Sequence, residues 1–226
     1  MEFERTKDLI GEVNFNKLKN SNIIIFGVGG VGGYALEMLA RSGVNNITIV
    51  DFDKVNITNI NRQIIALHST IGEYKVDVFE KRLKDINPNI NLTIKNEKVT
   101  KNNLDEFNLS KFDYVLDCID SFQDKLALIE YCYFNKINII SSMGAGNRYK
   151  PTNFIVQDIF KTSNDPLARK LRANLKKIGV NKLKVCSPNT IIDNESDKTK
   201  VFSISYNVAL SGITLASFII NDIIKK

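Results

Sequence analysis

Cysteine and histidine are scarce in this chain, and their scarcity excludes several kinds of site. Among 226 residues there are three cysteines and one histidine. Cys118, Cys132 and Cys186 form no C-x-x-C pair, so a zinc ribbon is not expected. So sparse and odd a count also argues against a disulfide framework and favours a reducing compartment. The single histidine, His68, is expected to pack or to cap a short helical stretch rather than to act in catalysis.

Long apolar segments are also missing from the sequence. The first twelve residues, MEFERTKDLIGE, have no apolar core of the signal-peptide type. The most apolar late stretch, 208–220, is interrupted by serine, glycine and threonine. It therefore reads as too short and too polar to span a bilayer. We expect a cytoplasmic protein that does not associate with membranes.

Charge is unevenly distributed in an otherwise ordinary globular composition. Hydrophobic residues make up 43% of the chain and charged residues 25%, which is enough to build a core at this length. The net charge is +6, but segment 161–184 alone carries +7 and the rest of the chain −1. A concentrated basic patch is typical of a surface that binds a polyanion such as RNA. From charge alone, a solvated lysine-rich helix is the alternative.

Hydrophobic periodicity divides the first two thirds of the chain into alternating strands and helices. Strand-like runs, the third of them weak, occur at 23–28, 46–51, 91–96, 112–117 and 137–142. Helical spacing lies between them, at 31–42, 74–86 and 123–135. Alternation of this kind predicts a parallel sheet covered by helices on both faces. The fold class is therefore α/β, with residues 1–150 forming a Rossmann-like, doubly wound, mostly parallel unit.

The remaining residues, 151–226, depart from that rhythm. They predict a C-terminal α/β extension that belongs to the same compact domain. Its expected parts are a strand at 153–159, a basic helix at 165–178, a polar loop at 188–200, an alternating stretch at 201–206 and a closing helix at 207–225.

The glycine-rich motif GVGGVG follows the first predicted strand and opens the first helix of the alternating unit. Gly27 permits a tight turn, Gly29 and Gly30 let the backbone approach a ligand, and Gly32 permits close packing of helix on strand. The helix N-terminus offers free N–H groups and a partial positive charge to a phosphate. Asp51 ends the next strand, where a carboxylate accepts hydrogen bonds from ribose hydroxyls. The motif predicts a nucleotide site, but it does not distinguish NAD from ATP.

The segment after the second strand favours ATP. It is rich in amide and cationic side chains, namely Asn59, Asn61, Arg62 and Gln63, and Lys75 opens the following helix. Arg62 and Lys75 would place two positive charges near a polyphosphate, which suits phosphate transfer chemistry and has no purpose in hydride transfer. The alternative for each of them alone is an ordinary surface cation.

Asp120 follows the strand predicted at 112–117, with Cys118 and Ile119 between them. Ligand crevices of open α/β sheets lie outside the carboxyl ends of the strands. A carboxylate there can hold Mg²⁺ or face the reacting phosphate. The competing interpretation is that Asp120 caps the next helix, a role for which Ser121 is an equal candidate.

Taken together, these motifs resemble the superfamily of ubiquitin-activating enzymes and their bacterial relatives of thiamine and molybdopterin synthesis. The matching stretches, within residues 22–120, are GVGGVG, Asp51-Phe-Asp53, Asn59-Ile-Asn61-Arg62-Gln63, Gly72-Glu-Tyr-Lys75 and Asp117-Cys-Ile-Asp120. The resemblance implies that Asp51 binds the ribose, that Asn59, Arg62 and Lys75 hold the phosphates, and that Asp120 serves Mg²⁺ and the α-phosphate. It also implies a homodimer in which Arg5 reaches the nucleotide of the partner subunit. The implied ATP-binding set is Gly27, Gly29, Gly30, Gly32, Asp51, Asp53, Asn59, Arg62, Gln63, Lys75 and Asp120.

A narrower resemblance covers the second half of the chain. Ser141-Ser-Met-Gly-Ala-Gly-Asn147 and Lys161-Thr-Ser-Asn-Asp165-Pro-Leu-Ala168 look like the tRNA threonylcarbamoyladenosine dehydratase branch of the superfamily. That branch uses ATP to cyclise the threonylcarbamoyl group beside the tRNA anticodon, through an adenylated carboxylate. The resemblance gives the basic segment a substrate. The side chains expected to meet tRNA phosphates are Lys161, Arg169, Arg172 and Lys176.

Two other functions remain open at this point. One is an adenylating activator of a small ubiquitin-like sulfur carrier, which would have a sulfur-transfer or carrier protein as partner. The other is a non-enzymatic NAD-type binding module, for which the cationic residues would have no purpose. Superfamily members that pass an acyl group onward often use a cysteine, and Cys186, in a late polar segment, is the candidate; packing is the alternative.

Overall fold

The computed structural model describes residues 2–193 and 201–225. Its centre is a seven-stranded sheet in the order β3-β2-β1-β4-β5-β7-β6, in which only the β6–β7 pair is antiparallel. The predicted mostly parallel α/β architecture is confirmed. The strands are β1 (Asn22–Phe26), β2 (Asn46–Val50), β3 (Asn91–Lys95), β4 (Tyr114–Asp117), β5 (Ile139–Ser142), β6 (Phe154–Asp158) and β7 (Lys184–Pro188).

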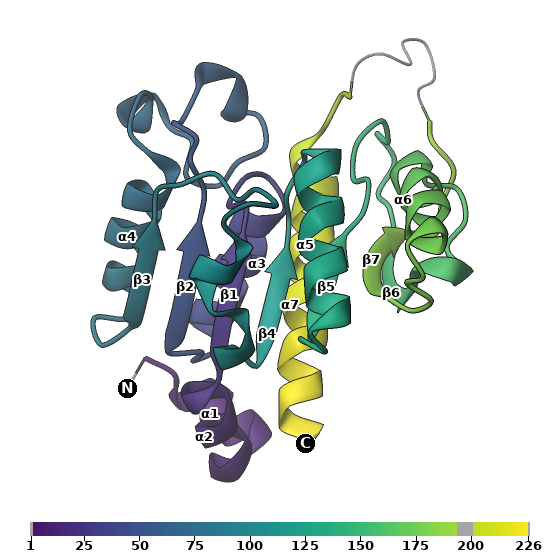
Figure 1. Ribbon diagram of the computed structural model, residues 1–226. Helices are drawn as coiled ribbons and strands as arrows, with labels where there is room; N and C mark the ends of the chain where they lie inside the picture. The colour runs from purple at the N-terminus through teal and green to yellow at the C-terminus, as the bar shows by residue number, and fades with distance from the viewer. Residues whose placement is uncertain (1, 194–200, 226) are drawn as a thin grey trace.

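Helices cover both faces of this sheet, as the alternating pattern predicts (Figure 1). One face carries α5 and α6, and the opposite face carries α3 and α7, which lie against each other. The helices are α1 (Glu4–Ile10), α2 (Glu12–Asn20), α3 (Gly32–Arg41), α4 (Lys75–Ile86), α5 (Phe122–Phe134), α6 (Pro166–Lys177) and α7 (Ser205–Lys225).

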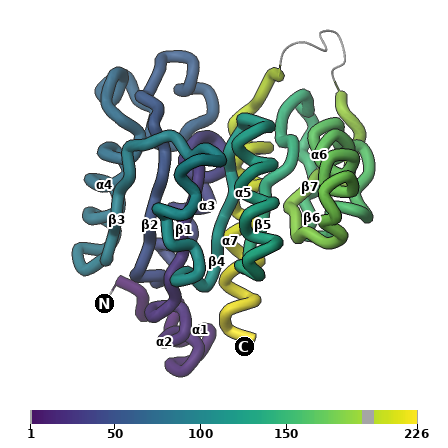
Figure 2. The backbone as a smooth tube through the Cα atoms, viewed as in Figure 1, coloured from purple at the N-terminus to yellow at the C-terminus, as the bar shows by residue number. Residues whose placement is uncertain are grey.

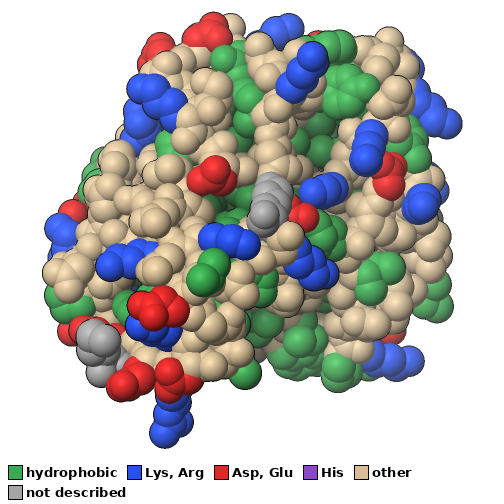
Figure 3. All heavy atoms as spheres, turned by 90° about the horizontal axis from the view of Figure 1, so that it is seen from below, with side chains coloured by type: hydrophobic (Ala, Val, Ile, Leu, Met, Phe, Trp, Pro, Cys, Tyr) green, Lys and Arg blue, Asp and Glu red, His purple; other side chains and the backbone are tan. Residues whose placement is uncertain are grey.

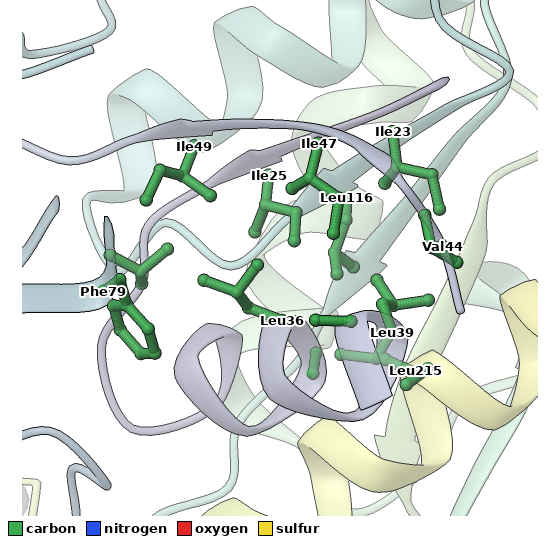
Figure 4. Close-up of a cluster of buried hydrophobic side chains, with 14 of the residues drawn as sticks. Ile23, Ile25, Leu36, Leu39, Val44, Ile47, Ile49, Phe79, Leu116 and Leu215 are labelled. Atoms are coloured by element: carbon green, nitrogen blue, oxygen red, sulfur yellow. The ribbon is translucent and has the colours of Figure 1, made fainter. Parts of the chain in front are cut away.

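Alternation along the strands builds a separate core on each face. In β1, Ile23 and Ile25 join the cluster that contains α3, α4 and α7, whereas Ile24 and Phe26 join the cluster that contains α5 and α6. Figure 4 shows the first cluster, in which Leu36 and its neighbours lie beneath the strand side chains. Burying one such side chain completely contributes about 1.5–3 kcal/mol. The central strands are therefore held from both sides, and the loops that follow them have fixed starting points.

Several expectations about the chain's second half need correction. The alternating stretch at 201–206 is divided: residues 201–204 lie outside regular structure, and α7 begins at Ser205 rather than at 207. The periodicity did not predict strand β7, nor helices α1 and α2 at the start of the chain. The expected polar loop overlaps the end of β7 and continues to residue 193; its part at 194–200 lies outside the described residues. Strands from both sides of residue 150 share one sheet; the division at that residue stays a prediction.

Helix α7 is longer and more apolar than the sequence suggested. It has 21 residues, and an 18-residue window within it has a mean hydropathy of 1.5, so by length and composition alone it could cross a membrane. This corrects the expectation of a stretch too short and too polar. The helix packs on α3 and on the strands, and a Cβ placed on Gly212 would lie 2.4 Å from the carbonyl oxygen of Val31. Packing of this closeness explains its apolar and small residues as those of a core helix.

Candidate active site

The glycine turn joins β1 to α3, and two of its glycines are required by the chain itself. Gly27 has a φ of +83°, and a Cβ there would lie 2.7 Å from the carbonyl oxygen of Cys118. A Cβ on Gly32 would lie 1.9 Å from the carbonyl oxygen of Gly27. Since no larger side chain fits either position without a backbone shift, the turn holds the start of α3 against the end of β4.

The two middle glycines differ from that pair. A Cβ on Gly29 would lie 3.6 Å from Nε2 of Gln63, and one on Gly30 would lie 3.5 Å from Val208. These are ordinary contact distances, so internal packing does not demand glycine at either position. Their missing side chains leave the backbone N–H groups open to a ligand, which supports the predicted role of Gly29 and Gly30.

Asp51 ties the end of β2 to the glycine turn. Its Oδ2 accepts a hydrogen bond from the N–H of Val28 at 2.8 Å, and its Oδ1 accepts one from the N–H of Asp53 at 2.9 Å. Burial raises the pKa of this carboxyl, and the positive charge of Lys75 opposes that rise. A carboxylate has about four acceptor positions. Asp51 therefore retains capacity for ribose hydroxyls beside the turn.

Lys75 opens α4 and faces the same end of β2. Its Nζ lies 2.7 Å from Oδ2 of Asp53. The lysine side chain is 6% exposed, whereas that of Asp53 is 48% exposed. The ammonium is thus held at a fixed place by one carboxylate, and it has two further N–H donors for a phosphate.

The amide-rich segment forms a short turn that presents Arg62 and Gln63 to the glycines. Buried Asn59 accepts hydrogen bonds at its carbonyl from the N–H groups of Arg62 and Gln63, at 3.0 and 2.9 Å. Nη1 of Arg62 donates to the carbonyl of Thr58 and to Asn61. Within the described residues, Nε and Nη2 of Arg62 have no hydrogen-bond partner. The guanidinium therefore has donors left for an anion.

Gln63 lies against the turn with an unsatisfied acceptor. Its side chain is buried, and within the described residues its Oε1 has no hydrogen-bond partner. Leaving a buried acceptor unpaired costs about 1–3 kcal/mol. A nucleotide that donates a hydrogen bond at this place would relieve that cost, which supports Gln63 as part of the binding set.

Asp120 stands where β4 ends, two residues after the carbonyl that closes on Gly27. The N–H of Cys118 bonds to the carbonyl of Phe26 at 2.8 Å, which fixes the segment beside the turn. The Asp120 side chain is exposed, and the described residues offer it no hydrogen bond or ion pair. Helix α5 begins one residue after Ser121, and no side chain caps it. The capping alternative is therefore not seen.

Beneath Asp120 lies a buried ionic cluster that periodicity did not reveal. Nζ of Lys125 lies 2.8 Å from Oδ2 of Asp117, 3.2 Å from Oγ of Ser141 and 3.1 Å from the carbonyl oxygen of Ser142. The Lys125 side chain is 1% exposed and that of Asp117 is fully buried. The cluster joins α5 to the ends of β4 and β5. A lysine on the apolar side of the predicted helix, next to Leu-Ala-Leu-Ile, was the available signal.

Arg5 lies far from this set within one chain. It is exposed on α1, which together with α2 and the last turns of α7 forms the end of the molecule opposite the glycine turn (Figures 1 and 2). Nζ of Lys17 on α2 donates to the carbonyl of Ile224 on α7. Seen from below, the molecule shows cationic and acidic side chains mixed with apolar ones (Figure 3). The structure thus gathers every predicted nucleotide residue except Arg5.

The four cations proposed for tRNA are not equivalent. Lys161, Arg169 and Lys176 are exposed. Arg172 is half-buried, and its Nη1 donates to the carbonyl of Thr162 at 2.8 Å. Because Arg172 fastens the segment before α6 to the helix, it has less freedom to meet a phosphate than the other three.

The burial of Cys186 and of His68 differs from what the sequence predicted. Cys186 belongs to buried strand β7 rather than to a polar segment, and burial raises the pKa of its thiol to about 12. Such a thiol is almost entirely protonated near neutral pH. Because the thiolate is the nucleophile, acyl transfer to Cys186 is not supported. His68 opens the short helical stretch His68–Thr70, as expected, but it is exposed, so of its two expected roles packing is wrong and capping stays a prediction.

Comparison with known proteins adds to this geometry. Residues 3–223 match the ThiF family. The tRNA threonylcarbamoyladenosine dehydratase of Bacillus subtilis is 44% identical over 80% of this chain and 71% of its own length. That of Escherichia coli is 42% identical over 77% of this chain and 65% of its own length. A crystal structure of the Escherichia coli enzyme with ATP superimposes with a TM-score of 0.92 at 33% identity, covering 99% of this chain and 94% of that one.

Proposed function

We propose, since this chain belongs to the ThiF family, that it is an ATP-dependent tRNA threonylcarbamoyladenosine dehydratase. The carrying observation is that the glycine turn, Asp51, Arg62, Lys75 and Asp120 meet at the carboxyl end of the sheet. The similarity to dehydratases, over 80% of this chain in sequence and 99% of it in a structure solved with ATP, supports the same activity. An NAD-type binding module would leave these charges without a purpose.

The reaction divides into an activation and a cyclisation. The carboxylate of the threonylcarbamoyl group attacks the α-phosphorus of ATP, and pyrophosphate leaves. The acyl-adenylate that forms has AMP as a good leaving group. A nitrogen of the same substrate then closes the ring and releases AMP, so that one water is lost overall. The nucleophile belongs to the substrate, which agrees with the burial of Cys186.

Electrostatics is the main contribution expected from the protein, because both reactants are anionic. Arg62 and Lys75 would offset the charge of the phosphates, and the glycine turn would hold the nucleotide for attack in line with the leaving group. Arg5 would reach the nucleotide from a second copy of the chain. A homodimer follows from that role.

Asp120 is the residue proposed to hold Mg²⁺. Among the described residues no group of three or more histidine, cysteine or acidic side chains forms a metal cage. Mg²⁺ commonly binds through one or two carboxylates, water and substrate phosphates. A single exposed carboxylate beside the phosphate-binding turn fits that pattern. Bound there, Mg²⁺ would neutralise phosphate charge.

The substrate surface is proposed to include Lys161, Arg169 and Lys176 on and before α6. Contacts of lysine and arginine with phosphates make binding fall steeply with salt. A tRNA-modifying enzyme of this kind would act in the cytoplasm.

The test is to incubate the purified protein with Mg-ATP and tRNA bearing threonylcarbamoyladenosine, digest the RNA and measure nucleoside masses. Loss of one water from that nucleoside, matched by AMP, is the expected result. If the mass is unchanged and ATP–pyrophosphate exchange appears only with a ubiquitin-like protein, the dehydratase assignment is wrong and the sulfur-carrier function takes its place.

A further inference from the structure

The connection from β5 to β6 presents an aromatic ring to solvent. Tyr149 is 60% exposed, and Nζ of Lys150 lies 5.7 Å from its ring centroid. The connection leaves β5 at the same end of the sheet at which Asp120 follows the adjacent strand β4. An exposed ring with a cation beside it is a combination that binds unpaired nucleobases.

The backbone around this ring is fastened from two other segments. Oδ2 of Asp193 accepts hydrogen bonds from the N–H groups of Tyr149 and Lys150, each at 3.0 Å. The carbonyl of Tyr149 accepts a hydrogen bond from the hydroxyl of Tyr206. Buried Asn207 donates to the carbonyl of Lys150 at 3.0 Å. The exposed ring therefore projects from a backbone with little freedom.

A buried arginine holds the same connection from inside. Arg148 is 4% exposed, and its guanidinium donates to the carbonyls of Gly144, Gly146 and Asn164 at 3.2, 3.0 and 2.8 Å. Burial lowers the pKa of Arg148, and the charge of Asp165 opposes this. Desolvating a guanidinium is costly. The chain thus uses a buried cation to fix a surface connection whose neighbouring ring, Tyr149, is 60% exposed.

We propose that Tyr149 is a stacking platform for an unpaired nucleobase of the tRNA substrate, next to the nucleoside that is modified. The proposal rests on the dehydratase function and extends it. Charge favours RNA as the occupant: Lys150 is 71% exposed, with its Nζ 3.9 Å from Oδ1 of Asp193, and Arg169 lies exposed in the first turn of α6. The hydrogen bond from Arg148 to the carbonyl of Asn164 connects the loop of Tyr149 to the segment that leads into this basic helix.

The experiment measures tRNA binding by Tyr149→Ala, Tyr149→Phe and the wild type, using a fluorescently labelled anticodon stem-loop and anisotropy. Loss of one stacked base predicts an increase in Kd of roughly tenfold for the alanine variant. The phenylalanine variant keeps the ring and is expected to bind within about twofold of the wild type. The matched control is Phe134→Ala, because Phe134 is 57% exposed at the other end of α5; it should bind as the wild type does.

The outcomes that overturn the platform can be told apart from the one that overturns the proposed function. Unchanged Kd in Tyr149→Ala, with dehydration by the wild type intact, refutes it. A weakened dimer in sedimentation, with tRNA affinity unchanged at concentrations where both proteins are dimeric, assigns the ring to contact between copies instead. If the wild type binds the stem-loop but never dehydrates the nucleoside, the proposed function fails, and the ratio of the two Kd values still decides the platform.

Discussion

Replacing Lys125 by methionine tests whether the buried ionic cluster holds the floor of the site. The substitution keeps a long unbranched side chain and removes the ammonium. It deletes three hydrogen bonds of 2.8, 3.2 and 3.1 Å, to Asp117, Ser141 and the carbonyl of Ser142. The carboxylate of Asp117 then stays fully buried without a cation, keeping only the hydroxyl of Ser141 and the N–H of Ile119.

The structure sets the expected size of this effect. Removing one partner of a buried ion pair costs about 3–5 kcal/mol, because the other charge is left uncompensated. Two neutral donors still bond to Asp117, so the expected loss in the free energy of unfolding lies near the middle of that range. Changing Asp117 to asparagine in the same chain removes the stranded charge. The double variant is therefore expected to recover about 1–3 kcal/mol relative to Lys125→Met alone.

Urea unfolding followed by circular dichroism measures these differences. The control is Lys170→Met, since Lys170 is exposed and lies 4.0 Å over the ring of Phe122 on the neighbouring helix. An exposed cation–π contact contributes about 0.5–1 kcal/mol. If Lys125→Met unfolds within about 1 kcal/mol of the wild type, or no differently from Lys170→Met, the reasoning from burial is refuted.

The other predictions concern the turn, the proposed metal residue and acid stability. Gly32→Ala should abolish ATP binding measured by calorimetry, because its Cβ would lie 1.9 Å from the carbonyl oxygen of Gly27; normal affinity would contradict this. Asp120→Ala should lower AMP formation at least about a hundredfold at unchanged melting temperature, because it removes the carboxylate proposed to hold Mg²⁺ at the phosphates. Near-wild-type turnover would refute this role. Burial would raise the pKa of Glu37, but hydrogen bonds from Arg82 and Arg41 hold it lowered. Stability from Glu37 should thus be lost as pH falls below about 4.5, and Glu37→Gln should flatten urea midpoints there.

The features that could be predicted are those for which the type of residue at a position is enough to determine the local structure. Gly27 has positive φ and Asp51 ends a buried strand, and both are readable from spacing. The alternation of strands and helices fixed which loops share an end of the sheet. That placement is enough to bring Arg62 beside Gly30, where a Cβ would lie 3.6 Å from Cγ of the arginine.

The features that could not be predicted depend on contacts between distant segments. Lys125 lies on the apolar side of its helix, but its partners Ser141 and the carbonyl of Ser142 come from β5, and no local pattern names them. Arg148 is buried only because the loops containing Gly144 and Asn164 close around it. Strand β7 is short and begins with lysine, and its place between β5 and β6 comes from pairing rather than from periodicity. No local pattern encodes such partners.

Arg5 lies apart from the other residues predicted to bind the nucleotide. Every other residue of the predicted nucleotide set lies at the carboxyl end of the sheet, whereas α1 lies at the opposite end. Helix α2 contacts the same end of the molecule, where Nζ of Lys17 donates to the carbonyl of Ile224 on α7. We therefore propose that Arg5 contributes to adenylation in the site of a second copy. Mixing an Arg5→Ala chain with a Lys75→Ala chain should then restore about a quarter of the activity by random pairing, since one heterodimer site in two has both residues. If both variants are inactive alone and stay inactive when mixed, Arg5 does not act in the site of a second copy. A fully active Arg5→Ala variant would place Arg5 outside the reaction.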